Sequence, residues 1–221
     1  MKTPEERKVL SEQIIQAKGI AINAWLPMLP PRSEVTLKDT ETVCRRAIAA
    51  LLSTQVALDI SNQNYGHVKF FIDLMKKYGV MDCLNTKERN LVNGTFSNQD
   101  AADVVWEYEC YWSLVWALGL IADTDMEDAG KICDCQRAIR LVAECSGFEA
   151  FLSKCQMRDI EEILDMLDLY YRYHWATVEK KWVNPDLPIG NLNEEIVFER
   201  RRGLEWLISD QENWHDISLD T

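Results

Sequence analysis

The sequence predicts an all-α fold, a helical bundle around a buried central helix at about 97–121. Two observations support this class. Apolar residues recur every three or four positions in one segment after another, and no convincing run alternates like a β-strand outside an extended, proline-containing strap near 20–38. Because 47% of the 221 residues are hydrophobic, the chain can build a substantial core. We therefore expect a single domain over 1–221, in which an N-terminal helix and the strap (1–38) pack on a body (39–221).

The N-terminal helix has clear signals at both ends. Thr3 can cap it, Pro4 suits its first position, and Glu6 can reach back to the Thr3 amide to complete a capping box. The helix should run to Lys18, after which Gly19 can adopt the left-handed conformation that ends many helices. Prolines then keep the strap out of a helix.

The remaining helices follow the apolar pattern along the chain. Asp39 is a good N-cap for a helix through Leu58. Further helices are expected at 67–78, from 86 to a stop at Gly94, at 97–121 after the cap Ser97, and at 135–145, 148–155, 158–182 and 193–209. The segment from Val104 to Ile121 is apolar on every side, which is typical of a central buried helix. At such helical spacings, most of the eight tryptophans should lie in the core.

The charge is strongly negative and unevenly spread. Residues 1–110 carry 13 Lys and Arg against 14 Asp and Glu, whereas residues 111–221 carry 11 against 22. An acidic half repels phosphates, so nucleic acid is disfavoured as a partner, and the same field would attract a basic protein surface. There is no secretion signal and no apolar run of about 18 or more residues, so a membrane is not expected as a partner either.

No cofactor or metal is predicted. The seven cysteines are odd in number and scattered, which is typical of reduced thiols and of a cytoplasmic protein. Cys133 and Cys135 are followed by Cys145 and Cys155, but one intervening residue is tighter than the usual zinc spacing. In the acidic stretch 123–128, carboxylates fit the start of a calcium loop, but Asp stands where the turn glycine is needed, so an exposed loop is the favoured interpretation.

Three ionisable residues, Glu109, His174 and Arg200, fall in the middle of apolar helical stripes. Glu109 shares a face with Trp112 and Trp116, and it is the one carboxylate that the pattern places on such an apolar face. A buried guanidinium without a carboxylate costs several kcal/mol, so we expect Arg200 to pair with Glu109. His174 should be hydrogen-bonded nearby.

The same patterns place other charged residues outside the core. Asp103 and Glu107 should point away from the apolar face of the central helix, and Arg172 should form an exposed helix pair with Asp168 four residues earlier. Trp182, in contrast, ends the apolar stripe that contains His174 and is expected in the core.

Two interpretations of the Glu109, His174 and Arg200 cluster stay open. It can be a structural clamp between the central and final helices, or the floor of an active site. In the second interpretation Glu109 or His174 is the acid or base and Arg200 holds an anionic substrate. Structural ion pairs also bury ionisable groups, so the sequence favours the clamp.

Several segments together resemble a largely bacterial family, domain of unknown function number 4272. They are Gly19-Ile20 leading to Leu26-Pro27, Arg45-Arg46-Ala47, Leu114 to Gly119, Tyr171 to Ala176, Glu199-Arg200-Arg201 with Leu204 to Leu207, and Trp214-His215-Asp216. The resemblance covers nearly the whole chain. It implies a soluble bacterial protein with a single domain, and it assigns no activity, cofactor or catalytic residue.

These observations favour a non-catalytic protein-interaction module that uses its acidic C-terminal half toward a basic protein partner. The alternative is an enzyme acting on a small anionic substrate, with Glu109 and His174 as acid and base candidates and Arg200 as anion holder. The sequence does not predict an oligomeric state. The Asp216 to Thr221 tail should pack on the body through Trp214 and Leu219.

Overall fold

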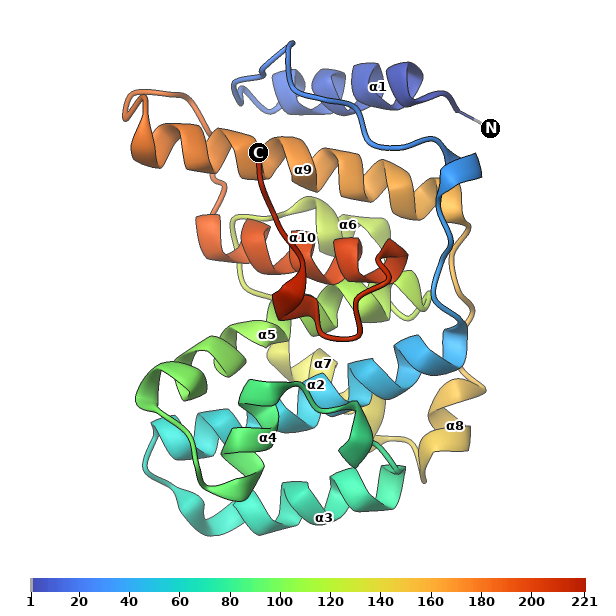
Figure 1. Cartoon of the computed structure of the whole chain (residues 1–221), viewed down its shortest axis with the longest axis vertical. Helices are drawn as coiled ribbons and strands as arrows, with labels where there is room; N and C mark the ends of the chain where they lie inside the picture. Colours follow the sequence, from blue (N-terminus) through green and yellow to red (C-terminus); the bar gives the residue numbers. More distant parts are fainter. Residues whose placement is uncertain (1) are drawn as a thin grey trace.

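The computed structural model describes residues 2–221, and every regular element in that range is helical (Figure 1). The elements are α1 (Pro4–Ala17), η1 (Arg32–Glu34), α2 (Thr40–Ser61), η2 (Tyr65–His67), α3 (Val68–Tyr78), η3 (Met81–Cys83), α4 (Thr86–Asn93), α5 (Asn98–Ala117), α6 (Asp123–Glu127), α7 (Cys135–Ala143), α8 (Phe148–Leu152), α9 (Ile160–Trp182), α10 (Glu194–Ile208) and η4 (Trp214–Asp216), where η marks a 3-10 helix. The predicted all-α class is confirmed.

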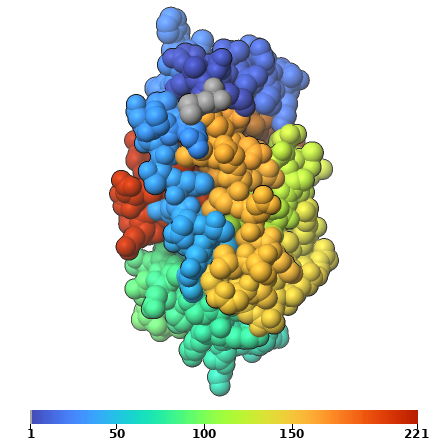
Figure 2. Space-filling view, turned by 90° about the vertical axis from the view of Figure 1, so that its right-hand side faces the viewer, coloured from blue at the N-terminus to red at the C-terminus, as the bar shows by residue number. Residues whose placement is uncertain are grey.

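Six helices form a stack in which each packs against the next. The order through the stack is α1, α9, α10, α5, α2 and α3, from the top to the bottom of Figure 1. Helices that are consecutive in the chain, such as α1 and α2, therefore lie in different parts of the molecule. Figure 2 shows the blue strap between α1 and α2 running down the side of the orange α9.

Helix α5 lies near the middle of the stack and is the buried central helix that the sequence predicts. Its side chains Tyr111, Trp112 and Trp116 are buried. Helix α10 approaches it closely at Gly203, where a Cβ atom would lie 2.8 Å from the Cys110 carbonyl oxygen. A larger residue would force the two backbones apart, so this glycine sets the distance between α5 and α10.

The helix caps and the helix stop at Gly19 that the sequence predicts are present in the structure. Thr3 and Glu6 form the capping box of α1, Gly19 has a φ of +68°, and the side chain of Asp39 accepts a hydrogen bond at the start of α2. Helix ends differ from the expected positions by a few residues. The strap is tied at both ends by backbone hydrogen bonds, from Ala21 N to Pro188 O and from Lys38 N to Leu207 O.

Two expectations about local structure are wrong. The acidic stretch at 123–128 contains the short helix α6, because the Asp125 carboxylate accepts a hydrogen bond from the Ala122 amide at its start. Asp123 also accepts one from the Trp116 indole, which holds the stretch against α5. Trp182 is 73% exposed, because it is the last residue of α9. None of the helices within residues 2–221 has the length and apolar character needed to cross a bilayer.

Candidate functional site

Glu109 of α5 and Arg200 of α10 form the predicted ion pair. Arg200 Nε donates to Glu109 Oε2 at 2.7 Å, across 91 positions of sequence. The side chains are 2% and 1% exposed. The expected meeting of these two residues, and their burial, are confirmed.

Each of the three guanidinium nitrogens of Arg200 donates to an acceptor within the fold. Its Nη1 donates to the Tyr170 hydroxyl at 3.1 Å and to the Asp128 carbonyl at 3.0 Å, and its Nη2 donates to the Lys131 carbonyl at 3.2 Å. The second oxygen of Glu109 accepts from the Cys133 amide. Although burial opposes the charge, Tyr170 and Glu109 raise the pKa of Arg200 above its ordinary value. The pair therefore ties α5 and α10 to α9 and to the segment between α6 and α7.

His174 has a different set of partners. Arg201 Nη1 donates to His174 Nδ1 at 2.6 Å, and the imidazole packs edge-to-face on Phe198. Burial and the neighbouring Arg201 charge lower the pKa of His174 to about 4, so the ring is neutral at pH 7. Within the described part of the chain, His174 forms no hydrogen bond with Glu109 or Arg200. Arg201 also donates to the Leu219 and Asp220 carbonyls, which ties down the C-terminal tail.

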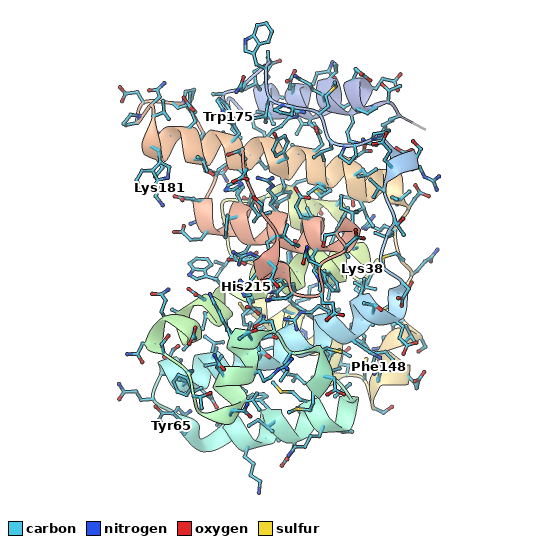
Figure 3. The ribbon with its side chains drawn as sticks, viewed as in Figure 1. Lys38, Tyr65, Phe148, Trp175, Lys181 and His215 are labelled. Atoms are coloured by element: carbon cyan, nitrogen blue, oxygen red, sulfur yellow. The ribbon has the colours of Figure 1, made fainter. Side chains whose placement is uncertain are left out.

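A second buried ion network, which sequence reasoning missed, surrounds Arg46 of α2. Arg46 donates to both oxygens of Glu88, one of them at 2.9 Å, and its Nη2 lies 3.6 Å from Glu107. Glu107 also accepts from Asn85 and lies 2.7 Å from Nε2 of His215 in the C-terminal segment. The network therefore joins α2, α4, α5 and η4. In Figure 3 the labelled His215 lies between α10 above and α2 below.

This network corrects two expectations. Glu107, expected to point away from the core, is fully buried, as is Glu88. Glu109 is therefore not the only buried carboxylate. The sequence did hold a signal: Arg46 lies three positions after Val43 and one before Ala47, on an apolar face of α2. Because α5 is apolar on every side, its sequence pattern does not show which of its positions face solvent.

The protonation of the Arg46 network is unusual. Burial raises the pKa of Glu88 to about 7, despite the opposing effect of Arg46, and burial also raises the pKa of Glu107. Burial lowers the pKa of His215 to about 4. Two carboxylates thus share one guanidinium, and near neutral pH one of them holds a proton part of the time.

The pair of Arg172 and Asp168 is buried, contrary to the expectation of an exposed helix pair. Both hydrogen bonds between the side chains are 2.9 Å long, and the residues are 3% and 1% exposed. They are buried because α1 lies on this face of α9, and Glu12 of α1 approaches Arg172 to 3.6 Å.

The hollows at the surface of residues 2–221 include a polar one and an acidic one, and neither of these is lined by Glu109, His174 or Arg200. The first, the polar cleft, has a volume of about 910 Å³ and lies between the start of α2, the start of α4 and residues 209–216. It is lined by charged and amide side chains and by two tryptophans, and Arg46 forms part of its wall.

The second hollow, the acidic groove, has a volume of about 440 Å³ and lies between α1, α6 and α9. Its apolar lining comprises Leu10, Ile14, Trp116, Met166 and Leu169, and its carboxylates are Asp123, Glu127, Glu162 and Asp165. Lys2 and Arg7 also line it and pair with Asp165.

Metal ligands do not converge within residues 2–221, where no three His, Cys, Asp or Glu side chains could hold an ion. Cys133 and Cys135 are free thiols, as are Cys145 and Cys155. The fold thus defines a helical protein with buried ion pairs inside and with open hollows at its surface, one of which reaches the Arg46 network.

Its family follows from comparison with known sequences. The model of the family described as Domain of unknown function (DUF4272) matches residues 7–217, and the chain belongs to that family. No curated protein and no solved structure matches the chain. The family description assigns no chemistry.

Proposed function

We propose that this protein is a non-catalytic interaction module of the cytoplasm and that the acidic groove binds a basic amphipathic segment of another protein. The observation that carries the proposal is the orientation of α1. A surface helix normally buries its apolar side chains and exposes its polar ones. Helix α1 buries Arg7 and Ser11 together with Ile15, and it leaves Leu10 and Ile14 42% and 43% exposed.

The buried polar face of α1 is well anchored, so the orientation is a stable one. Arg7 donates to Glu161 at 3.0 Å and to Asp165 at 3.2 Å, both on α9. These bonds hold α1 with Leu10 and Ile14 facing outward. Exposed apolar side chains beside a hollow are characteristic of protein interaction sites.

The charge around the groove favours a basic partner. Glu127 and Glu162 are exposed at its edge, and Glu127 forms no ion pair within the described residues. The whole chain carries a formal charge of −12, which disfavours a second copy of itself as the occupant. A segment with two or three apolar side chains on one face and Lys or Arg beside them would match both the apolar lining and the acidic edge.

The alternative, an enzyme using Glu109, His174 and Arg200, draws no support from this arrangement. None of the three side chains lines the polar cleft or the acidic groove, and each guanidinium nitrogen of Arg200 already has an acceptor within the fold. The pair acts as a clamp in our proposal.

The test compares a groove variant with a matched surface variant in a pull-down from native lysate at low and raised salt. The groove variant is Leu10→Asp with Ile14→Asp. The control is Val183→Asp, which also places an acid at an exposed apolar position, at the far end of α9. We expect one partner to be retained by the wild type and by the control, and to be lost from the groove variant. Each lost apolar contact should weaken binding at least about tenfold.

Charge is tested with Glu127→Lys and Glu162→Lys. Both should weaken retention of the same protein. Raised salt should weaken retention by the wild type, because it shortens the Debye length, about 10 Å at 0.1 M, beyond which attraction between exposed charges is largely screened. The proposal fails if no protein is retained at low salt, if retention is indifferent to salt, or if the groove variant retains the same proteins as the control.

A further inference from the structure

We propose that the polar cleft is a second binding site, independent of the acidic groove, and that it takes a small zwitterion, an amino acid or a dipeptide. In this arrangement the carboxylate of the ligand lies toward Arg46 and Trp214, and its ammonium group lies toward the acidic residues at the edge of the cleft, Asp210 and Glu212.

The first line of evidence is a pair of buried donors. Arg46 and Trp214 both line the cleft and are 5% and 1% exposed. Arg46 Nε and Trp214 Nε1 are buried, and neither has an acceptor among the described residues. Buried donors are nearly always satisfied, because an unmade hydrogen bond there is costly. Since the guanidinium lies 3.9 Å from the centre of the indole ring, one acceptor group of a ligand could serve both residues.

The second line of evidence is the depth of the charges. Lys38, Arg45 and Arg46 line the cleft and are buried or half-buried. The lining carboxylates Asp82, Asp210, Glu212 and Asp216 are all exposed, and within residues 2–221 none of them forms an ion pair. Arg89 is an exposed cation on the same lining, and Arg46 shares its charge with the buried Glu88 and Glu107. The cleft therefore presents groups of both signs, with its unpaired carboxylates at the edge.

This arrangement discriminates between classes of ligand. A polyanion such as a nucleoside triphosphate would meet the acidic edge, and a polyamine would meet the cations inside. A molecule with one anionic and one cationic group can satisfy both. The volume of about 910 Å³ lies within the range of small-molecule sites, about 300–1,000 Å³, and leaves room for a dipeptide.

The tryptophans do not offer a stacking platform for a sugar or a base. Trp206 and Trp214 are buried, and each has a cation over its ring, Lys38 at 4.9 Å and Arg46 at 3.9 Å. Recognition in the cleft therefore depends on charge and on hydrogen bonds, to which amide side chains such as Asn90 and Gln211 can contribute.

The experiment is isothermal titration calorimetry of the whole protein with the twenty free amino acids and a panel of dipeptides. Acetate, inorganic phosphate, spermidine and a nucleoside triphosphate serve as probes that carry charge of one sign. We expect at least one zwitterion to bind, and the single-sign probes to bind at least tenfold more weakly. Binding only by phosphate or the triphosphate would overturn the proposal, and so would binding by no amino acid or dipeptide.

Two variants test the placement of the ligand. Trp214→Phe removes the indole N–H while keeping an aromatic ring beside Arg46, and it should weaken binding about fivefold, the effect of one hydrogen bond. Asp210→Asn with Glu212→Gln changes only exposed side chains, so the fold is preserved, and it should weaken binding by a similar factor. Trp182→Phe, outside the cleft, should leave binding unchanged. Unchanged affinity in both cleft variants would overturn the placement.

Discussion

The two buried arginines of this protein differ in how completely the fold uses them. Arg200 meets one carboxylate, Glu109, and all three of its guanidinium nitrogens have acceptors. Arg46 meets two carboxylates, Glu88 and Glu107, and its Nε has no acceptor within residues 2–221. Arg200 lines neither hollow, whereas Arg46 lines the polar cleft.

This difference shows how a buried ion pair can be assigned to structure or to ligand binding. An arginine whose three guanidinium nitrogens all have acceptors within the fold, and which lines no hollow, serves to hold helices together. Arg46 lines an open cleft and its Nε has no acceptor among the described residues, so it can donate a hydrogen bond to a ligand. Burial alone, which the two residues share, does not distinguish the roles.

The largest effect is expected where the pair of Arg200 and Glu109 is broken. Arg200→Met leaves Glu109 buried without its partner and leaves the Tyr170 hydroxyl and several carbonyls without a donor, so it should lower the free energy of unfolding by about 3–5 kcal/mol. Urea denaturation measures this loss. In the double variant Glu109→Met, Arg200→Met, the loss should be smaller than the sum of the two single losses. A folded Arg200→Met protein of unchanged stability would contradict the clamp.

The next effect concerns the Arg46 network and its dependence on pH. The pKa of Glu88 is raised to about 7 from an ordinary value of 4.5, so the unfolded chain releases this proton before the folded protein does. Between pH 4.5 and 7 this residue therefore reduces stability as the pH rises, by on the order of 2–3 kcal/mol in total. The glutamine of Glu88→Gln does not titrate. The free energy of unfolding of this variant, relative to that of the wild type, should therefore increase as the pH rises from 4.5 to 7.

Denaturation of both proteins at several pH values checks this prediction. Glu149→Gln, which changes an exposed carboxylate of α8, is the control for net charge. If the difference in stability between Glu88→Gln and the wild type is constant from pH 4.5 to 7, Glu88 does not titrate in this window.

A smaller loss is expected at the seam between α5 and α10 that holds the Arg200 pair. Gly203→Ala places a methyl group 2.8 Å from the Cys110 carbonyl, which should cost about 1–3 kcal/mol, partly offset by the better helix propensity of alanine, about 1 kcal/mol. Gly147→Ala is the matched control, because no atom lies within 4 Å of its added Cβ. Equal melting temperatures for the two variants would show that the seam can widen freely.

The smallest effect compares two neighbouring tyrosines of α9. The Tyr170 hydroxyl accepts from Arg200 and donates to the Met126 carbonyl, so Tyr170→Phe should cost about 1 kcal/mol or somewhat more. The Tyr173 hydroxyl is buried, and no residue in the described part of the chain is its partner. Tyr173→Phe should therefore be neutral or slightly stabilising in thermal denaturation. An equal loss of stability in both variants would mean that the hydrogen bond between Arg200 and the Tyr170 hydroxyl does not contribute to stability.

The sequence by itself determined the helical class, most helix ends and one long-range ion pair. Helix ends depend on residues within one turn, as in the capping box of Thr3 and Glu6, so they can be predicted from local spacing. The meeting of Glu109 and Arg200 could be predicted because a charge in the middle of an apolar stripe must find an opposite charge.

Only the tertiary structure decided which polar faces are buried and where surface hollows form. Arg172 is buried because α1 covers it, and Glu107 is buried because α2 and α4 meet α5 there. Helix α1 buries Ile15 but turns Leu10 and Ile14 outward, because Arg7 finds carboxylates on α9, more than 150 positions away in sequence. Such outcomes depend on which helices become neighbours, and spacing within a single helix carries no information about that choice.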